Sequence, residues 1–165
     1  MRRLIASLAA VGAVFLIAFP VQANGAGALS FTQTFHNFTQ VFTPPAPQAF
    51  NPCTGAPGTL TLVYNGVFHV NVLTSGIGAG TGWDTFTATG SATFVQLDGV
   101  TYTGNFTAWD GASANLQNFA ATGILVGHLD GSDGSSLDFH DVMHIAVLAG
   151  NPPSVVVSFD KLTCG

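Results

Sequence analysis

Apolar and polar residues alternate along most of this chain with a period of two, which is typical of strands with one buried face. No window keeps the 3.6-residue apolar period of an amphipathic helix over three turns. Breaks rich in Gly, Pro, Asn and Asp divide the alternation into segments. The pattern predicts seven strands, at residues 29–42, 59–73, 83–97, 100–109, 115–129, 136–148 and 154–163.

The dipeptide Asn65-Gly66 lies inside the second predicted strand and has the composition of a two-residue hairpin turn. The phase of the pattern favours a single strand. Apolar residues keep the even positions on both sides of Gly66, from Leu60 to Val72, whereas a two-residue turn would move them to odd positions. We therefore expect one long strand bent at Gly66, with an eighth strand as the alternative.

The connections between the predicted strands are short, with turns expected at Asp98-Gly99, at Asp110-Gly111 and at 150–153. Short connections make neighbouring strands antiparallel. No predicted helix covers a face of the sheet, and closure is the usual way to remove exposed edges. The expected fold is an all-β, antiparallel, up-and-down barrel of seven or eight strands, with a β-sandwich as the alternative.

The N-terminus has the three parts of a secretory signal peptide. Arg2 and Arg3 precede an apolar run that ends at Pro20, and Val21-Gln22-Ala23 is a small-x-small cleavage signal. The run is shorter than the roughly 20 residues of a membrane-spanning helix. We expect residues 1–23 to form a signal helix that is removed, with cleavage after Ala28 or an uncleaved anchor as alternatives. A single secreted or envelope-located domain of residues 24–165 would remain, with no stable membrane insertion.

Cleavage would leave one basic residue, Lys161, against eight Asp and no Glu, a net charge of −7 with neutral histidines. Nucleic acid is excluded as a partner, because binding to phosphates needs clustered Lys and Arg. The high content of apolar and aromatic residues excludes a disordered chain.

The two cysteines, Cys53 and Cys164, permit one intramolecular pairing, and an exported chain favours a disulfide. The bond would join the loop after the first strand to the last strand. Its loop of about 110 residues would stabilise the fold by roughly 4–5 kcal/mol in the chain-entropy model. A pair of reactive thiols is the alternative, although the chain has no C-x-x-C motif.

Histidines on polar strand faces are the candidate metal ligands. The chain has five histidines, each expected on the more polar face of its strand: His36, His69, His128, His140 and His144. His140 and His144 lie about 13 Å apart on a strand, so one metal ion would need a histidine from a neighbouring strand. The candidates for a divalent metal are His69, His140, His144 and Asp138, with ordinary surface histidines as the alternative. No other cofactor is predicted.

No catalytic residues are assigned, and an enzyme is not the favoured interpretation. The chain has no Gly-x-Ser-x-Gly elbow and no Glu for a paired-carboxylate glycosidase. The stretch Asp130-Gly-Ser-Asp133-Gly lacks the remaining ligands of a calcium loop and is expected to be a turn. Threonine-rich strand faces are ordinary solvent faces, with ice or carbohydrate binding as the alternative.

A series of short motifs follows in fixed order along the chain: Asn51-Pro-Cys53-Thr-Gly, Tyr64-Asn-Gly-Val-Phe-His69, Tyr102-Thr-Gly-x-Phe-Thr-x-Trp109, Gly131-Ser-Asp-Gly134, Phe139-His-Asp-Val-x-His144 and Val157-Ser-Phe-Asp-Lys-x-x-Cys164. Together they resemble a family of small secreted bacterial proteins of unassigned function. The resemblance implies a β-barrel with one disulfide from the Asn-Pro-Cys loop to the C-terminal cysteine. This chain departs from it at Asp141, where Glu is common, and in the turn at 150–153. Allene oxide cyclase and dirigent barrels are similar by fold analogy alone.

Three functions remain open from the sequence. A non-enzymatic extracellular binding or structural module is favoured, because the strand faces are polar and no catalytic set is evident. The second is a barrel that binds a small apolar ligand, as in an isomerase or cyclase, with Ala88, Gly90, Ala92, Gly104 and Gly123 leaving room inside. The third is an outer-membrane barrel. The oligomeric state and the identity of a small molecule or surface partner stay open.

Overall fold

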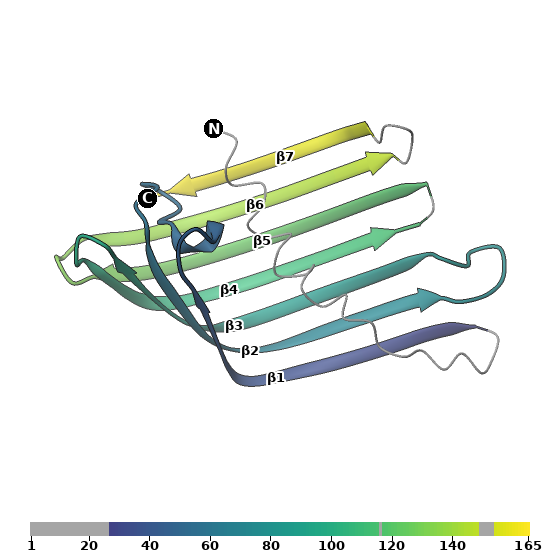
Figure 1. Cartoon of the computed structure of the whole chain (residues 1–165), viewed down its shortest axis with the longest axis horizontal. Coiled ribbons are helices and arrows are strands. Elements are labelled where there is room, and N and C mark those ends of the chain that lie inside the picture. Colours follow the sequence, from purple (N-terminus) through teal and green to yellow (C-terminus); the bar gives the residue numbers. More distant parts are fainter. Residues whose placement is uncertain (1–26, 116, 149–153) are drawn as a thin grey trace.

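The computed structural model describes residues 27–115, 117–148 and 154–165. Its strands form one antiparallel sheet in which each strand pairs with its sequence neighbour (Figure 1). They are β1 (Ala28–Phe42), β2 (Gly58–Leu73), β3 (Gly82–Gln96), β4 (Thr101–Ala114), β5 (Asn118–Gly131), β6 (Ser136–Leu148) and β7 (Ser154–Cys164), and a short 3-10 helix, η1 (Pro47–Ala49), follows β1. The prediction of an all-β, antiparallel, up-and-down sheet is confirmed.

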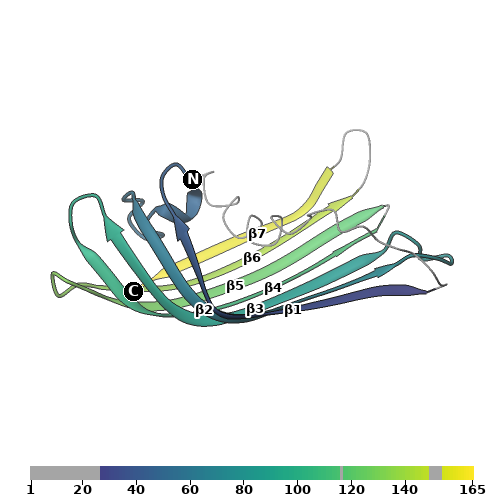
Figure 2. The same ribbon diagram turned by 60° about the horizontal axis from the view of Figure 1, so that its bottom comes forward.

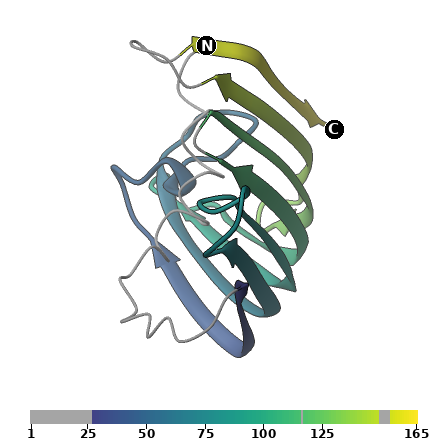
Figure 3. The same ribbon diagram turned by 90° about the vertical axis from the view of Figure 1, so that its right-hand side faces the viewer.

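The sheet is strongly curved but not closed. β1 and β7 are its two edges, and Figure 3 shows them at the two ends of an arc. An up-and-down sheet of seven strands leaves its first and last strands pointing in the same direction. Closing it would need a parallel pairing, with a hydrogen-bond pattern different from that of every other pair. The described residues therefore show an open sheet, without the predicted barrel closure and without the second sheet of a sandwich.

The two faces of the sheet follow the period-two pattern. The strands bend toward the side on which η1 lies, which makes that face concave (Figure 2). Buried apolar side chains gather on the concave face, among them Phe35, Tyr64, Phe86, Ala88, Phe94, Phe106, Leu129 and Leu137. Aromatic rings there meet edge to face, for example Tyr64 with Phe86 at a centroid distance of 6.1 Å. Threonine, asparagine and histidine side chains occupy much of the convex face.

β2 runs without a break through Gly66, so the expected single strand is confirmed and no eighth strand forms at this dipeptide. Asn65 pairs with Thr89 and Gly66 pairs with Ala88 in one continuous register with β3. The pairing of β2 with its other neighbour, β1, is irregular at this point. β1 has a β-bulge just after Phe35, the residue that pairs with Gly66.

The prediction of a turn at Asp110-Gly111 is wrong. β4 continues to Ala114, and Asp110 and Gly111 pair with Phe86 and Thr85 of β3. Two flanking strands of similar length supply backbone partners to this part of the chain, and these ladders override the local turn preference. The chain turns later, where Asn115 Oδ1 accepts hydrogen bonds from the backbone N–H groups of residues 117 and 118.

The connection from β1 to β2, residues 43–57, crosses the concave face and is held there by a buried asparagine. The side chain of Asn51 is 2% exposed. Its Oδ1 accepts hydrogen bonds from the N–H groups of Cys53 and Thr54 at 2.9 and 3.1 Å, and its Nδ2 donates to Gln96 Oε1 at 2.9 Å. Because Gln96 ends β3, this network attaches the loop to the sheet.

A disulfide between Cys53 and Cys164 attaches the same loop to the end of β7, which confirms the predicted pairing. The bond is compatible with an extracellular location. The predicted signal helix at residues 1–23 and the predicted turn at 150–153 lie outside the described residues. No helix in the described part of the chain is long and apolar enough to cross a membrane.

Replacing both cysteines, Cys53→Ser with Cys164→Ser, should lower the free energy of unfolding by roughly 4–5 kcal/mol, because the crosslink joins residues 111 positions apart in sequence. Urea unfolding followed by circular dichroism would measure this. The wild type unfolded in reductant is the control and should share the midpoint of the variant. Equal midpoints for the variant and the oxidised wild type would contradict the prediction.

Candidate functional site

A cavity of about 150 Å³ lies on the concave face, between the sheet and the loop that crosses it. Side chains from β1 to β6 form its floor, and Pro47, Phe50 and Pro52 of the loop form its roof. Most of the floor is apolar: Phe42, Leu60, Leu62, Phe86, Ala88, Ala92, Phe94, Phe106, Ala108, Leu125, Leu129, Leu137 and Phe139. The loop and the curvature of the sheet therefore form a mostly apolar space.

Small residues on the concave face have two different effects. Ala88 and Ala92 line the cavity, and their short side chains leave space in it. Gly90 and Gly104 instead let neighbouring strands approach. A Cβ at Gly90 would lie 2.1 Å from the carbonyl oxygen of Val63, and a Cβ at Gly104 would lie 2.0 Å from that of His128. The expectation that these small residues make room inside thus holds for the alanines but not for these two glycines.

Few polar side chains interrupt the apolar lining. Gln40 and Tyr64 lie near one another, and the phenol of Tyr64 donates to Gln40 Oε1 at 3.4 Å. The two ionisable acids in the lining are Asp110 of β4 and Asp141 of β6. An apolar cavity with a small number of polar groups is the usual composition of a small-molecule site.

Asp110 is half-buried on the concave face and pairs across the sheet with Phe86. Burial raises the pKa of its carboxyl group to about 6, and the charge of Asp84 on the neighbouring strand adds to the rise. Burial also raises the pKa of Asp84. Asp110 therefore changes charge in the mildly acidic range, in contact with apolar surface.

Asp141 is the second acid of the cavity and has an unsatisfied atom. Its Oδ1 is buried and has no hydrogen-bond partner among the described residues. Burial, together with the neighbouring carboxyl of Asp160, raises the pKa of Asp141 to about 6. A buried oxygen without a partner costs about 1–3 kcal/mol, so a hydrogen-bond donor placed in the cavity would be favoured there.

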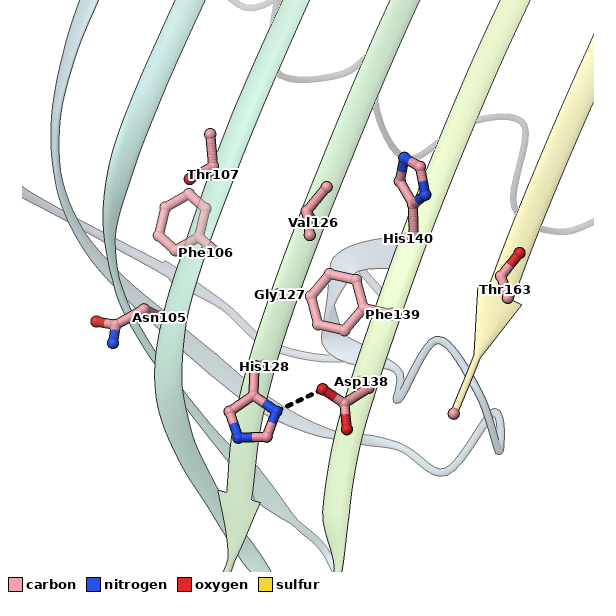
Figure 4. Close-up of a pocket in the computed structure, with 11 residues that line it drawn as sticks. Asn105, Phe106, Thr107, Val126, Gly127, His128, Asp138, Phe139, His140 and Thr163 are labelled. Carbon is pink, nitrogen blue, oxygen red and sulfur yellow. Dashed lines mark hydrogen bonds and ion pairs between the residues drawn. The ribbon is translucent and has the colours of Figure 1, made fainter.

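A second, open hollow lies on the convex face over β4, β5 and β6 (Figure 4). His128 Nδ1 and a carboxylate oxygen of Asp138 form a hydrogen bond across β5 and β6. His128 Nε2 lies 3.6 Å from Asp130 Oδ1. The bond to Asp138 raises the pKa of His128, although its side chain is 62% exposed. Solvent screens this pair, so the hollow is a polar surface feature.

The predicted metal candidates are spread over the convex face. Asp138 and His140 border the open hollow, but His144 bonds Thr122 Oγ1 through Nδ1 at 2.7 Å. His69 lies on β2, where its ring nitrogens contact Thr32 Oγ1 at 2.6 Å and Asn71 Nδ2 at 2.7 Å. Within residues 27–115, 117–148 and 154–165, no three His, Cys, Asp or Glu side chains come together to hold a metal ion. The candidates are therefore not brought together.

The sequence interpretation missed Asp110, Asp141 and His128 as site residues. The sequence pattern predicts a turn at Asp110. Asp141 had a signal, because it interrupts the apolar face of its strand. His128 also had one, since residues 128 and 138 lie at equal distances from the centre of the turn between β5 and β6 and so face each other.

Comparisons of the chain with protein-family models, with curated proteins and with solved structures found no match. The arguments for a function therefore come from the chain's own residues.

The free energy of unfolding should fall as the pH rises from about 4 to about 6. The folded protein holds protons on Asp110 and Asp141 up to about pH 6, whereas the unfolded chain releases them near the ordinary value of 3.8. Stability is then greatest below the unfolded pKa and is lost as the pH rises through the folded one. Solvent reaches both groups, so we expect about 1 kcal/mol from each.

Urea unfolding between pH 4 and pH 7 measures the slope of the unfolding free energy against pH. The double variant Asp110→Asn, Asp141→Asn should have a smaller slope. Asp130→Asn, at an exposed carboxyl outside the cavity, is the matched control. A slope that survives in the double variant would assign the effect to other groups.

Proposed function

We propose that the mature chain is a secreted, non-enzymatic binding module that holds a small, mostly apolar molecule in the cavity of its concave face. The observation that carries the proposal is the buried, unpartnered Oδ1 of Asp141 in a mostly apolar lining. Apolar surface binds the body of the molecule, and the carboxyl oxygen accepts a hydrogen bond from it.

The size of the cavity limits the part of the ligand that is enclosed. A volume of about 150 Å³ is below the roughly 300–1,000 Å³ of sites for drug-sized molecules. An apolar cavity of this size accommodates a body as large as benzene. We expect a ligand whose buried part is about one ring, with a single hydroxyl or N–H group that donates to Asp141.

Secretion is part of the proposal and is supported by two features. The first 23 residues have the pattern of a signal peptide, and the disulfide between Cys53 and Cys164 suits an oxidising compartment. An exported carrier of apolar molecules needs a stable covering over its cavity. The loop that carries Cys53 supplies this covering, since it forms the roof.

N-phenyl-1-naphthylamine, a fluorescent apolar amine with one N–H group, should bind the wild-type protein with an increase in emission. Leu125→Trp adds volume to the cavity floor and should weaken this binding by roughly tenfold, about 1.4 kcal/mol. Val126→Trp is the matched control, because Val126 is the next residue of β5 and lies exposed on the convex face. Fluorescence titration at pH 5 gives both affinities.

Equal weakening by the two variants would assign the probe to another surface. A wild-type protein that leaves the emission of the probe unchanged would overturn the cavity as a binding site.

A further inference from the structure

The convex face carries two exposed indoles, and one of them has an unusual position. Trp109 of β4 is 39% exposed, and Trp83 of β3 is 42% exposed. A Cβ built at Gly111 would lie 3.4 Å from Cη2 and Cζ2 of Trp109. The benzene half of this indole therefore leans along the strand over Gly111, close to the sheet. A Cβ at that distance would be in ordinary van der Waals contact with the ring, so the indole packs directly against the backbone of Gly111.

Hydroxyl groups border this indole on both sides. Gly111 pairs with Thr85 of β3 on one side and with Thr122 of β5 on the other. Trp109 itself pairs with Thr87. Thr122 is oriented by its hydrogen bond with His144 Nδ1. The indole of Trp109 thus forms an apolar platform, surrounded by hydroxyl groups that both donate and accept hydrogen bonds.

Few ionisable side chains lie near the platform on the convex face, and His144 is one of them, because it bonds Thr122. On the convex face His128 lies six residues along β5 from Thr122, the partner of Gly111. The ion pair of His128 and Asp138 is therefore roughly 20 Å from Thr122 at the rise of a strand. Lys161 lies on the edge strand β7. The neutral side chains of Trp109, Thr85 and Thr87 suit an uncharged ligand, and the net negative charge of the chain repels anionic polymers.

We propose that Trp109, with Thr85, Thr87 and Thr122, binds a neutral polysaccharide on the convex face. A pyranose ring has an apolar C–H face that stacks on an indole, and hydroxyl groups at its rim that pair with threonine hydroxyls. Trp83 is four residues along the strand from Thr87, the partner of Trp109, and two residues from Thr85, the partner of Gly111. This site is separate from the concave cavity and does not depend on its ligand.

The chain has only two tryptophans, so a spectrum of ¹⁵N-labelled mature protein shows two indole N–H signals, which Trp83→Phe assigns. The probes are cellohexaose, laminarihexaose, xylohexaose and maltohexaose, each titrated separately. We expect the signal of Trp109 to shift and saturate with at least one of them, and the signal of Trp83 to shift much less.

Trp109→Ala should weaken the binding of that hexaose by roughly tenfold or more, as measured by calorimetry. Thr87→Val, which keeps the shape and removes the hydroxyl, should weaken it several-fold. Trp83→Ala removes an indole of similar exposure from the same face and should weaken the binding less than Trp109→Ala does. The proposal is overturned if no hexaose shifts the Trp109 signal in the wild type, or if both indole signals shift equally and without saturation.

Discussion

The attachment of one loop at two points determines most of what the concave face of this protein can do. Residues 43–57 leave the edge of the sheet at β1, cross the concave face and return as β2. The buried Asn51 ties the loop to the end of β3 through Gln96, and Cys53 ties it to the end of β7. Without these attachments, the apolar side chains beneath the loop would face water, and the cavity would have no roof.

The number of strands explains why a loop has this role. Seven strands in up-and-down order cannot close by antiparallel pairing, so the curved sheet keeps an open side. A covalent bond between the first connection and the last strand spans that side at one end of the sheet. The result is a cavity with a floor of strands and a roof of loop, into which two acids project with raised pKa values because apolar surface surrounds them.

The two faces differ in chemistry because every strand alternates. The concave face buries aromatic and aliphatic side chains and suits an apolar molecule. The convex face presents threonine, histidine and tryptophan and suits a ligand with many hydroxyl groups. One sheet can therefore carry two independent surfaces, and a substitution on one face leaves the neighbouring residue on the other face in place, as Leu125 and Val126 show.

The sequence by itself determined the strands, the faces and the disulfide. Alternation is a local property, so the residues that lie inward and the unbroken course of β2 through Gly66 were readable from the phase of the pattern. Two cysteines allow only one intramolecular pairing. The tertiary structure alone decided the features that depend on several strands at once. Long flanking strands extended β4 through Asp110-Gly111, where local preference indicated a turn. Because the number of strands is odd, β1 and β7 cannot pair in an antiparallel way, and the sheet stays open. Register placed His128 beside Asp138, separated His69 from His140 and His144, and surrounded Asp110 and Asp141 with apolar side chains. These outcomes depend on pairings between distant segments, whose free energies exceed the local preferences that a sequence pattern records.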